Sequence, residues 1–223
     1  MKYRVIDLFC GCGGISEDFR FTRRAELVGA IDFDQAACNT YQKNFPKSKI
    51  ICGDINEISV QTTGFKDVDI IVGGPPCQGF STLNYWNKDR DNDPRNKLFL
   101  QYLRFVEELQ PKAILIENVK NVLSAKDAFV PMTITQFLEE RGYNVSYSIV
   151  CAADYGVPQY RYRAIFVAIK KEYGRFNFEN LNKYKLPIVT AQDAISDISS
   201  IEKSAKEYEQ GTVFQLGKPE TVY

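Results

Sequence analysis

The chain alternates short apolar runs with stretches of helical periodicity, and this alternation constrains its fold more than any other feature. The helical stretches are expected at residues 15–24, 34–45, 96–109 and 127–141. Glycines, prolines or acids follow most of the apolar runs, as at the ends of strands. The apolar, strand-sized runs lie at residues 4–9, 27–31, 50–52, 68–72, 112–116 and 164–169, and residues 143–150 alternate between apolar and polar side chains as in a strand. Strands that alternate with helices predict an α/β fold with a doubly wound, mostly parallel sheet.

Composition is that of an ordinary globular domain. The 223 residues include 44% hydrophobic residues, enough for a sizeable core. The formal net charge is zero, which argues against binding nucleic acid by bulk charge alone but leaves room for a local basic groove. Six scattered cysteines without a CxxC pair favour a reducing compartment. No apolar run is long enough to span a membrane, so we expect a cytoplasmic protein without a membrane partner.

A stiff loop at Gly73–Ser81 is a candidate for chemistry. It follows the apolar run 68–72 and contains two adjacent glycines and two adjacent prolines, which forbid regular structure. Cys77 lies in this loop and is a candidate nucleophile, although a free cysteine more commonly packs as a small apolar residue. The chain has no histidine, which excludes a Cys–His hydrolase pair and a histidine-ligated zinc site.

A glycine-rich turn indicates a nucleotide site. The sequence Cys10-Gly11-Cys12-Gly13-Gly14 separates the first apolar run from the first expected helix, and Asp32 ends the second run. A glycine turn followed by an acid about 20 residues later is typical of nucleotide-binding folds. The G-x-G-G spacing lacks the third glycine that nicotinamide cofactors favour. The CxC pair is a weak metal signal, and small residues in a tight turn explain it better, so no metal site is predicted.

Other polar residues follow later strands. Asp54 follows the run 50–52, Glu117 follows the run 112–116, and Gln159-x-Arg161-x-Arg163 leads into the last run. Each has an ordinary alternative: a turn, a paired structural acid, or solvated charges. Arginines two apart on a strand would point the same way. Because ligands bind outside the carboxyl ends of strands in open α/β sheets, these residues and the glycine turn are expected at one edge.

Four of these stretches resemble, in order and spacing, the DNA cytosine-5 methyltransferase family. They are the turn from Asp7 to Gly14, the loop Gly73–Ser81, Glu117-Asn118-Val119, and the stretch from Gln159 to Arg163. The resemblance covers roughly residues 5–169. It implies a Rossmann-like, S-adenosylmethionine-dependent methyltransferase that acts on carbon 5 of cytosine in double-stranded DNA, within a restriction-modification system.

The resemblance also implies how the cofactor is held. The glycine turn would cradle the methionine part, Asp32 would bind the ribose, and Asp54 would accept a hydrogen bond from the adenine amino group. Phe33 would lie against the adenine, with core packing as the alternative for this residue. The cofactor residues implied in this way are Phe9, Gly11, Gly13, Gly14, Ile15, Asp32, Phe33, Asp54, Ile55, Gly74, Pro76 and Leu98.

The catalytic residues implied by the resemblance are Cys77, Glu117, Arg161 and Arg163. A Cys77 thiolate would add to carbon 6 of a cytosine that has been flipped out of the duplex. Protonated Glu117 would contact ring nitrogen 3 and the amino group, and Arg163, supported by Arg161, would hold the O2 side. Further contacts to the DNA or the cytosine are implied for Gln78, Ser81, Asn118 and Gln159.

Three alternatives stay open, and the family's pattern is not matched throughout. A transfer-RNA cytosine-5 methyltransferase is one, although Gly79-Phe80-Ser81 favours the DNA branch. An inactive DNA-binding or regulatory subunit and a nicotinamide enzyme are the others.

We divide the chain into a catalytic domain, 1–170, and a polar tail, 171–223. The family's target-recognition region and closing segment are not seen. We therefore expect this chain alone to be nearly inactive on DNA, with a second polypeptide or a C-terminal region supplying recognition.

Overall fold

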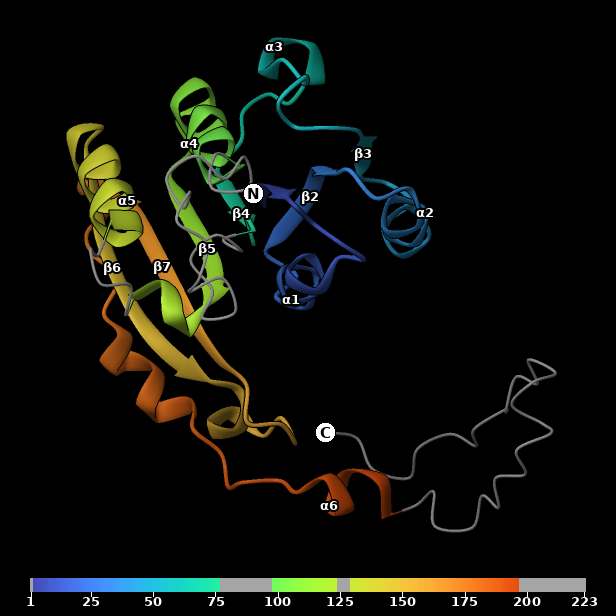
Figure 1. Ribbon diagram of the computed structural model, residues 1–223, viewed down its shortest axis with the longest axis vertical. Helices are drawn as coiled ribbons and strands as arrows, with labels where there is room; N and C mark the ends of the chain where they lie inside the picture. The colour runs from blue at the N-terminus through green and yellow to red at the C-terminus, as the bar shows by residue number, and fades with distance from the viewer. Residues whose placement is uncertain (1, 77–97, 124–128, 197–223) are drawn as a thin grey trace, which may run out of the picture. The chain divides into compact units, whose positions relative to one another are not determined.

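The computed structural model describes residues 2–76, 98–123 and 129–196 (Figure 1). These residues form two compact units. Among the described residues, the first unit comprises 2–76, 98–123, 129–150 and 162–182, and the second comprises 151–161 and 183–196. The boundary that the sequence suggested after residue 170 stays a prediction.

The first unit contains a seven-stranded sheet with the order β3-β2-β1-β4-β5-β7-β6. The four pairings among β1 to β5 are parallel, and β7 is antiparallel to β5. The chain runs outward from β1 to β3 and then returns to the other side of β1 with β4, which makes a switch point between β1 and β4. The strands are β1 (Tyr3–Leu8), β2 (Ala25–Asp32), β3 (Lys49–Cys52), β4 (Ile70–Gly73), β5 (Ala113–Val119), β6 (Tyr143–Cys151) and β7 (Tyr162–Lys170). The predicted doubly wound, mostly parallel sheet is confirmed.

The α-helices end close to where the sequence predicts. Asp34 caps the second helix, because its Oδ1 accepts a hydrogen bond of 2.7 Å from the backbone N–H of Ala37. Thr190 and Asp193 form a capping box at the last described helix. The helices are α1 (Gly14–Phe21), α2 (Gln35–Asn44), α3 (Val60–Thr63), α4 (Leu98–Leu109), α5 (Phe129–Glu140) and α6 (Ala191–Ile195), and four 3₁₀ helices are η5 (Lys120–Leu123), η6 (Ala152–Tyr155), η7 (Lys171–Tyr173) and η8 (Phe178–Tyr184). The sequence did not predict α3, which is only four residues long.

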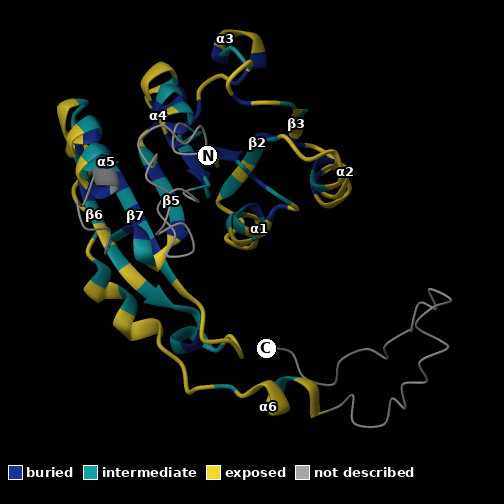
Figure 2. Ribbon diagram, in the orientation of Figure 1, coloured by how far each residue is buried: buried dark blue, intermediate teal, exposed yellow. Residues whose placement is uncertain are grey.

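Both faces of the central strands are packed. On one face, side chains of neighbouring strands in register, such as Ile6, Ile71 and Ile114, pack with apolar residues of α4 and α5. On the other face, Ala30 packs with Tyr41 and Phe45 of the α2 segment. The central strands are accordingly the most buried part of the sheet (Figure 2). Burial of this apolar surface is what fixes the strand ends, and therefore the site, relative to one another.

Two of the differences between the observed and the predicted strand boundaries concern candidate site residues. Glu117 and Asn118 lie within β5 rather than after it, because the pairing with β7 continues as far as Val119, opposite Arg163. Arg161 precedes β7, which begins at Tyr162. The expectation that both arginines lie on one strand and point the same way is therefore wrong for Arg161.

The close approach of β4 to β1 leads to a stability prediction. A Cβ atom on Gly73 would lie 2.1 Å from the carbonyl oxygen of Leu8, its register partner. Because a backbone atom cannot move aside cheaply, we expect Gly73→Ala to lower the free energy of unfolding by about 1–3 kcal/mol. Gly14→Ala is the matched control, since nothing lies within 4 Å of that position. Urea unfolding that gives the two variants equal stability would contradict the prediction.

Candidate active site

The glycine turn after β1 has an unusual backbone. Phe9, Gly11 and Gly13 all have positive φ angles of 61°, 54° and 97°. Gly13 has no room for a side chain, because a Cβ atom there would lie 2.2 Å from the Phe45 ring. Phe9 is held in this conformation by a 2.8 Å hydrogen bond from its N–H to the carbonyl of Ile31. A non-glycine residue in the left-handed region is often found at functional sites.

Asp32 ties this turn to the end of β2. One carboxylate oxygen accepts a 2.8 Å hydrogen bond from the backbone N–H of Gly11, and the other accepts one of 3.0 Å from Asp34. The sequence suggested Asp32 as a ribose ligand, whereas the structure also gives it a role in holding the turn. These hydrogen bonds hold the carboxylate beside the end of β1.

A pocket of about 410 Å³ opens at the carboxyl ends of β1 to β4. This volume lies within the usual range for small-molecule sites. Its wall is made by Phe9, Ile31, Asp32, Phe33, Gly53, Asp54, Ile55, Gly74, Pro76 and Leu98. Eight of these ten residues belong to the cofactor set that the sequence suggested, and the two missed, Ile31 and Gly53, are direct neighbours of predicted ones.

The other predicted cofactor residues lie next to the pocket rather than in its wall. Gly11 and Gly13 belong to the turn that follows Phe9, and Gly14 and Ile15 are the first two residues of α1. Phe33 is 78% exposed and lines the pocket, so the alternative that it packs in the core is wrong. The wall thus combines two aromatic rings, aliphatic side chains and two carboxylates.

An ion pair lies at the adjoining end of β5. Glu117 Oε1 is 2.6 Å from Arg163 Nε. The pairing of β5 with β7 places both side chains on the same face of the sheet. Glu117 also comes close to the loop after β4, since a Cβ atom on Gly74 would lie 3.3 Å from Glu117 Oε2. The carboxylate is therefore positioned from two sides, by β7 and by the glycine of the loop.

Asn118 fixes the start of the same loop. Its side chain, 6% exposed, donates a 2.9 Å hydrogen bond from Nδ2 to the carbonyl of Pro75. Residues Gly74 to Pro76 are therefore held next to β5. Cys77, the next residue in the sequence, lies outside the described residues, as do Gln78 and Ser81.

The remaining predicted residues, Gln159 and Arg161, belong to the second unit. There the Arg161 N–H donates to the Gln159 carbonyl at 2.9 Å, and the Arg161 carbonyl accepts from Ala152 N–H at 2.9 Å. Within the described ranges, no three metal-ligating side chains come together. Burial raises the pKa of the Cys10 thiol, which argues against this cysteine as a nucleophile. The described helices include none that is long and apolar enough to cross a membrane.

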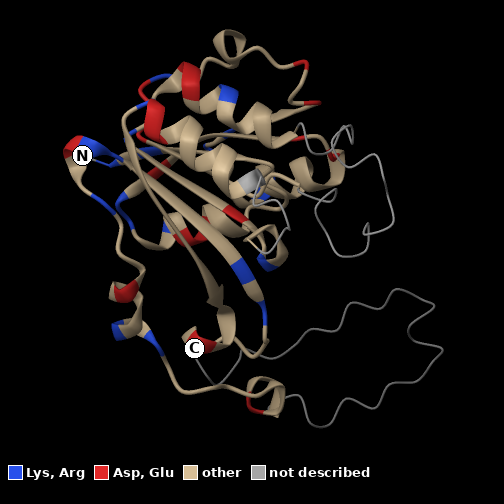
Figure 3. Cartoon of the chain, turned by 60° about the vertical axis from the view of Figure 1, so that its left-hand side comes forward, with Lys and Arg blue, Asp and Glu red and all other residues tan. Residues whose placement is uncertain are grey.

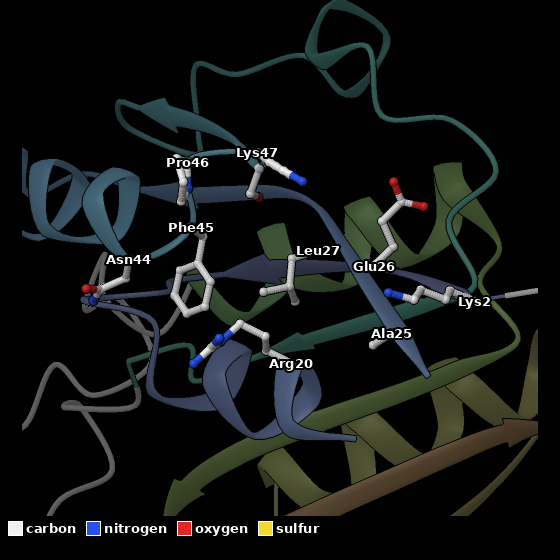
Figure 4. Close-up of a pocket in the computed structure, with 10 residues that line it drawn as sticks. Lys2, Arg20, Ala25, Glu26, Leu27, Asn44, Phe45, Pro46 and Lys47 are labelled. Carbon is white, nitrogen blue, oxygen red and sulfur yellow. The ribbon is translucent and has the colours of Figure 1, made fainter. Parts of the chain in front are cut away.

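A larger hollow, of about 660 Å³, lies elsewhere in the first unit (Figure 4). It includes Ala25, at the amino end of β2, and Phe45, after α2. The full lining is Lys2, Arg20, Ala25, Glu26, Leu27, Asn44, Phe45, Pro46, Lys47 and Ser48. None of the predicted site residues is among them, and ligands in open α/β sheets bind at the carboxyl ends. We therefore take the smaller pocket as the candidate site.

Charged residues of both signs are interspersed over the described elements (Figure 3). This distribution agrees with the formal net charge of zero. α4 illustrates it, because Arg104 lies on the same helix as Glu107 and Glu108. Association of this surface with a polyanion would depend on individual basic side chains rather than on a general positive field.

Comparison with known proteins gives consistent matches. A family model described as C-5 cytosine-specific DNA methylase matches residues 3–220. The chain is 36% identical to the type II methyltransferase M.XorII of Xanthomonas oryzae, over 97% of the chain and 51% of that protein. It is 40% identical to the type II methyltransferase M.FnuDI of Fusobacterium nucleatum, over 79% of the chain and 49% of that protein.

A solved structure agrees with these sequence matches. The crystal structure of a protein encoded within a prophage of E. coli superposes with a TM-score of 0.73 at 33% identity. The match covers 87% of this chain and 54% of that protein. The chain thus spans about half the length of the curated relatives that it matches.

Proposed function

Because the chain belongs to the C-5 cytosine-specific DNA methylase family, we propose that it forms the catalytic part of a methyltransferase acting on carbon 5 of cytosine in double-stranded DNA. S-adenosylmethionine would be the methyl donor. The observation that carries this proposal is the pocket wall, where eight residues expected from the resemblance meet at the switch point. Relatives named type II methyltransferases support a role in restriction and modification of DNA.

The pocket suits an adenosine-containing cofactor. Phe9, Phe33 and Ile55 offer apolar faces to a purine, and the carboxylates of Asp32 and Asp54 can accept hydrogen bonds from ribose hydroxyls and an amino group. The glycine turn next to Phe9 leaves backbone groups open to the methionine part. When bound, S-adenosylmethionine supplies an electrophilic methyl group on a sulfonium centre.

Cytosine carbon 5 is a weak nucleophile, and the proposed role of Cys77 is to activate it. The Cys77 thiolate forms a bond to carbon 6, which moves an electron pair toward carbon 5. Carbon 5 would then take the methyl group as the bond between that group and the sulfonium sulfur breaks, and it would lose its proton to a base before the thiolate leaves carbon 6. The sequence places Cys77 directly after Pro76, whose preceding residue is held by Asn118.

Glu117 and Arg163 are proposed to bind the edge of the cytosine ring. Their ion pair holds both side chains in place before substrate arrives, which limits the reorganisation needed in the reaction. Arg163 donors would serve the O2 side, and Glu117 would contact nitrogen 3 and the amino group. Glu117 and Arg163, already held in place, would then stabilise the negative charge that develops on the ring after thiolate addition. Arg161, Gln159, Gln78 and Ser81 stay proposed contacts to the arginine or the DNA.

The DNA duplex requires further steps. A base within the stack is out of reach of Cys77, so the target cytosine has to be flipped out. We propose that a target-recognition region, on a further part of the same chain or on a second polypeptide, supplies the sequence readout. The curated relatives are about twice as long as this stretch, which supports the proposal that a further region supplies the sequence readout.

Covalent trapping tests the proposed chemistry directly. DNA that carries 5-fluorocytosine lacks the proton that must leave carbon 5, so the adduct with the enzyme should persist. We expect mass spectrometry to locate the adduct at Cys77, and only when S-adenosylmethionine is present. The assay is run on this chain alone and with the polypeptide that carries the recognition region. A stable adduct on another residue would overturn the assignment.

A change at Asp32 should weaken the cofactor. Asp32→Ala removes a charge-assisted hydrogen bond to the ribose and also releases Gly11. We expect S-adenosylmethionine to bind roughly 10- to 150-fold more weakly, equivalent to about 1.5–3 kcal/mol. Isothermal titration calorimetry on the chain measures this.

Asp34→Ala is the matched control for Asp32→Ala. This carboxylate lies two residues further on, caps α2, and is not part of the pocket wall. It should lower the stability of the chain by about 1 kcal/mol but leave cofactor affinity unchanged. Equal losses of affinity in both variants would mean that Asp32 acts only through the local backbone.

A further inference from the structure

Three buried polar side chains form a hydrogen-bonded chain outside the pocket wall. Asp7 on β1, Ser16 on α1 and Tyr41 on α2 are 1%, 0% and 0% exposed. Ser16 Oγ donates to Asp7 Oδ2 at 2.7 Å and lies 2.9 Å from the Tyr41 hydroxyl. Since the single Ser16 proton is directed to Asp7, the Tyr41 hydroxyl is the donor to Ser16. Burial raises the pKa of Tyr41 to about 12, so it keeps its proton.

This chain of hydrogen bonds connects the two ends of the glycine turn. Asp7 is the penultimate residue of β1, and Ser16 lies in the first turn of α1. The backbone between them contains Phe9, Gly11 and Gly13, which all have positive φ angles. A conformation of this kind persists only when its surroundings fix it. The bond between Asp7 and Ser16 is such a constraint.

Tyr41 adds a second constraint from α2. Its ring packs against that of Phe45 in a tilted arrangement, with the ring centroids 4.7 Å apart, and both rings lie against Gly13. The Tyr41 hydroxyl meanwhile bonds to Ser16. One side chain therefore contacts the turn through its ring and the start of α1 through its hydroxyl.

The Asp7 carboxyl changes charge in the neutral range. Burial raises its pKa to about 7, hydrogen bonds from the side chain and backbone of Ser16 oppose the shift, and the negative charge of Asp32 adds to it. Three other titratable groups lie close enough to Asp7 for its negative charge to raise their pKa values: Cys10, Tyr41 and Tyr102. All three are acids, so none of them is a cation that could stabilise the ionised Asp7 carboxylate. Asp7 Oδ1 has no hydrogen-bond partner within the described residues.

We propose that Asp7, Ser16 and Tyr41 are positioning residues that hold the glycine turn in its cofactor-binding conformation, and that ionised Asp7 is the form that does so. This inference rests on the proposed function, because S-adenosylmethionine is the ligand that the turn would hold. An ionised acceptor makes the bond from Ser16 charge-assisted and about twice as strong as a neutral one. A protonated Asp7 can instead donate to Ser16, so the direction of the hydrogen bonds among Asp7, Ser16 and Tyr41 is no longer fixed.

The expected effect on stability is opposite in sign to that on binding. The Asp7 pKa of about 7 in the folded chain is above its ordinary value of 3.8. The carboxyl therefore stabilises the fold below about pH 4, and this contribution is lost as the pH rises through 7. Above about pH 7 the fold carries a buried charge, so Asp7→Asn should be more stable than the wild type. A purely structural residue would not lose ligand affinity while gaining stability.

The test is calorimetry of this chain with S-adenosylmethionine and with S-adenosylhomocysteine, which lacks the sulfonium charge. Measurements at about pH 6 and about pH 8 lie one unit on either side of the Asp7 pKa of about 7. Wild-type affinity for both ligands should rise by up to about tenfold between these pH values, following the ionised fraction of Asp7. Asp7→Asn should bind more weakly at the higher pH and show a flat profile.

Two further variants make the outcome decisive. Ser16→Ala should weaken binding and flatten the profile even if Asp7→Asn folds poorly, whereas Tyr41→Phe should weaken binding but keep the pH dependence. A pH dependence confined to S-adenosylmethionine would indicate direct charge attraction and overturn the inference. Unchanged affinity and profile in Asp7→Asn and Ser16→Ala would also overturn it, with the proposed function intact. A wild-type chain that binds neither ligand would overturn both.

Discussion

Cys77→Ser is expected to reduce methyl transfer by roughly three orders of magnitude or more in whatever assembly of this chain methylates DNA. A serine hydroxyl is much harder to ionise than a thiol and adds poorly to carbon 6, so the proposed covalent route would be lost. S-adenosylmethionine affinity should stay within about twofold of wild type, because serine is close in size to cysteine and the described loop residues that line the pocket, Gly74 and Pro76, are unchanged. Transfer of a tritiated methyl group and calorimetry measure the two effects.

Cys151→Ser provides the matched control. Cys151 is a free, half-buried thiol at the end of β6 and is not part of the pocket wall. It should leave the transfer rate unchanged, which would show that the loss in Cys77→Ser is specific to the loop. A Cys77→Ser enzyme within tenfold of the wild-type rate would exclude Cys77 as the nucleophile.

Glu117→Gln is expected to slow methyl transfer by about 10²- to 10⁴-fold, the range typical of losing a positioned acid or base. Glutamine has nearly the same shape, but its neutral amide cannot take up a proton and return it, and it no longer pairs electrostatically with Arg163, 2.6 Å away. Cofactor binding should be unaffected, because Glu117 lies outside the pocket wall. A single-turnover assay on pre-bound DNA isolates the chemical step from DNA binding.

The control for this substitution is another glutamate in an ion pair of the same length. Glu107 on α4 lies 2.6 Å from Arg141, and its side chain is more exposed than that of Glu117. Glu107→Gln should change the single-turnover rate by less than about twofold, since a surface ion pair contributes little. If both variants were equally slow, or neither were, the catalytic role of Glu117 would be rejected.

The sequence predicted the architecture because short local patterns indicate most of the strands and helices. Apolar runs such as 68–72, ended by glycine or proline, indicate buried strands, and Asp34, the first residue of the expected helical stretch 34–45, indicates a helix start through its capping chemistry. The alternation of strands and helices then leaves few topologies other than a doubly wound sheet. The short α3 was missed because four residues give no measurable periodicity.

Much of the candidate site also followed from the sequence. Polar residues at strand ends have to meet at one edge once the sheet is parallel, and this rule brings Asp32 and Asp54 to the same pocket. The resemblance to a known family then assigned a role to each position, including residues such as Leu98 whose type alone indicates only packing.

Tertiary structure alone decided how these residues are held. The extent of β5 depended on its antiparallel partner β7, which placed Glu117 inside the strand opposite β7 and next to Arg163. Hydrogen bonds between distant residues, such as Asn118 to Pro75 and Ser16 to Asp7, depend on packing that local sequence does not encode. The raised pKa of Asp7 has the same origin. Burial between packed layers sets it, and no neighbour in the sequence predicts how deep a carboxyl will lie.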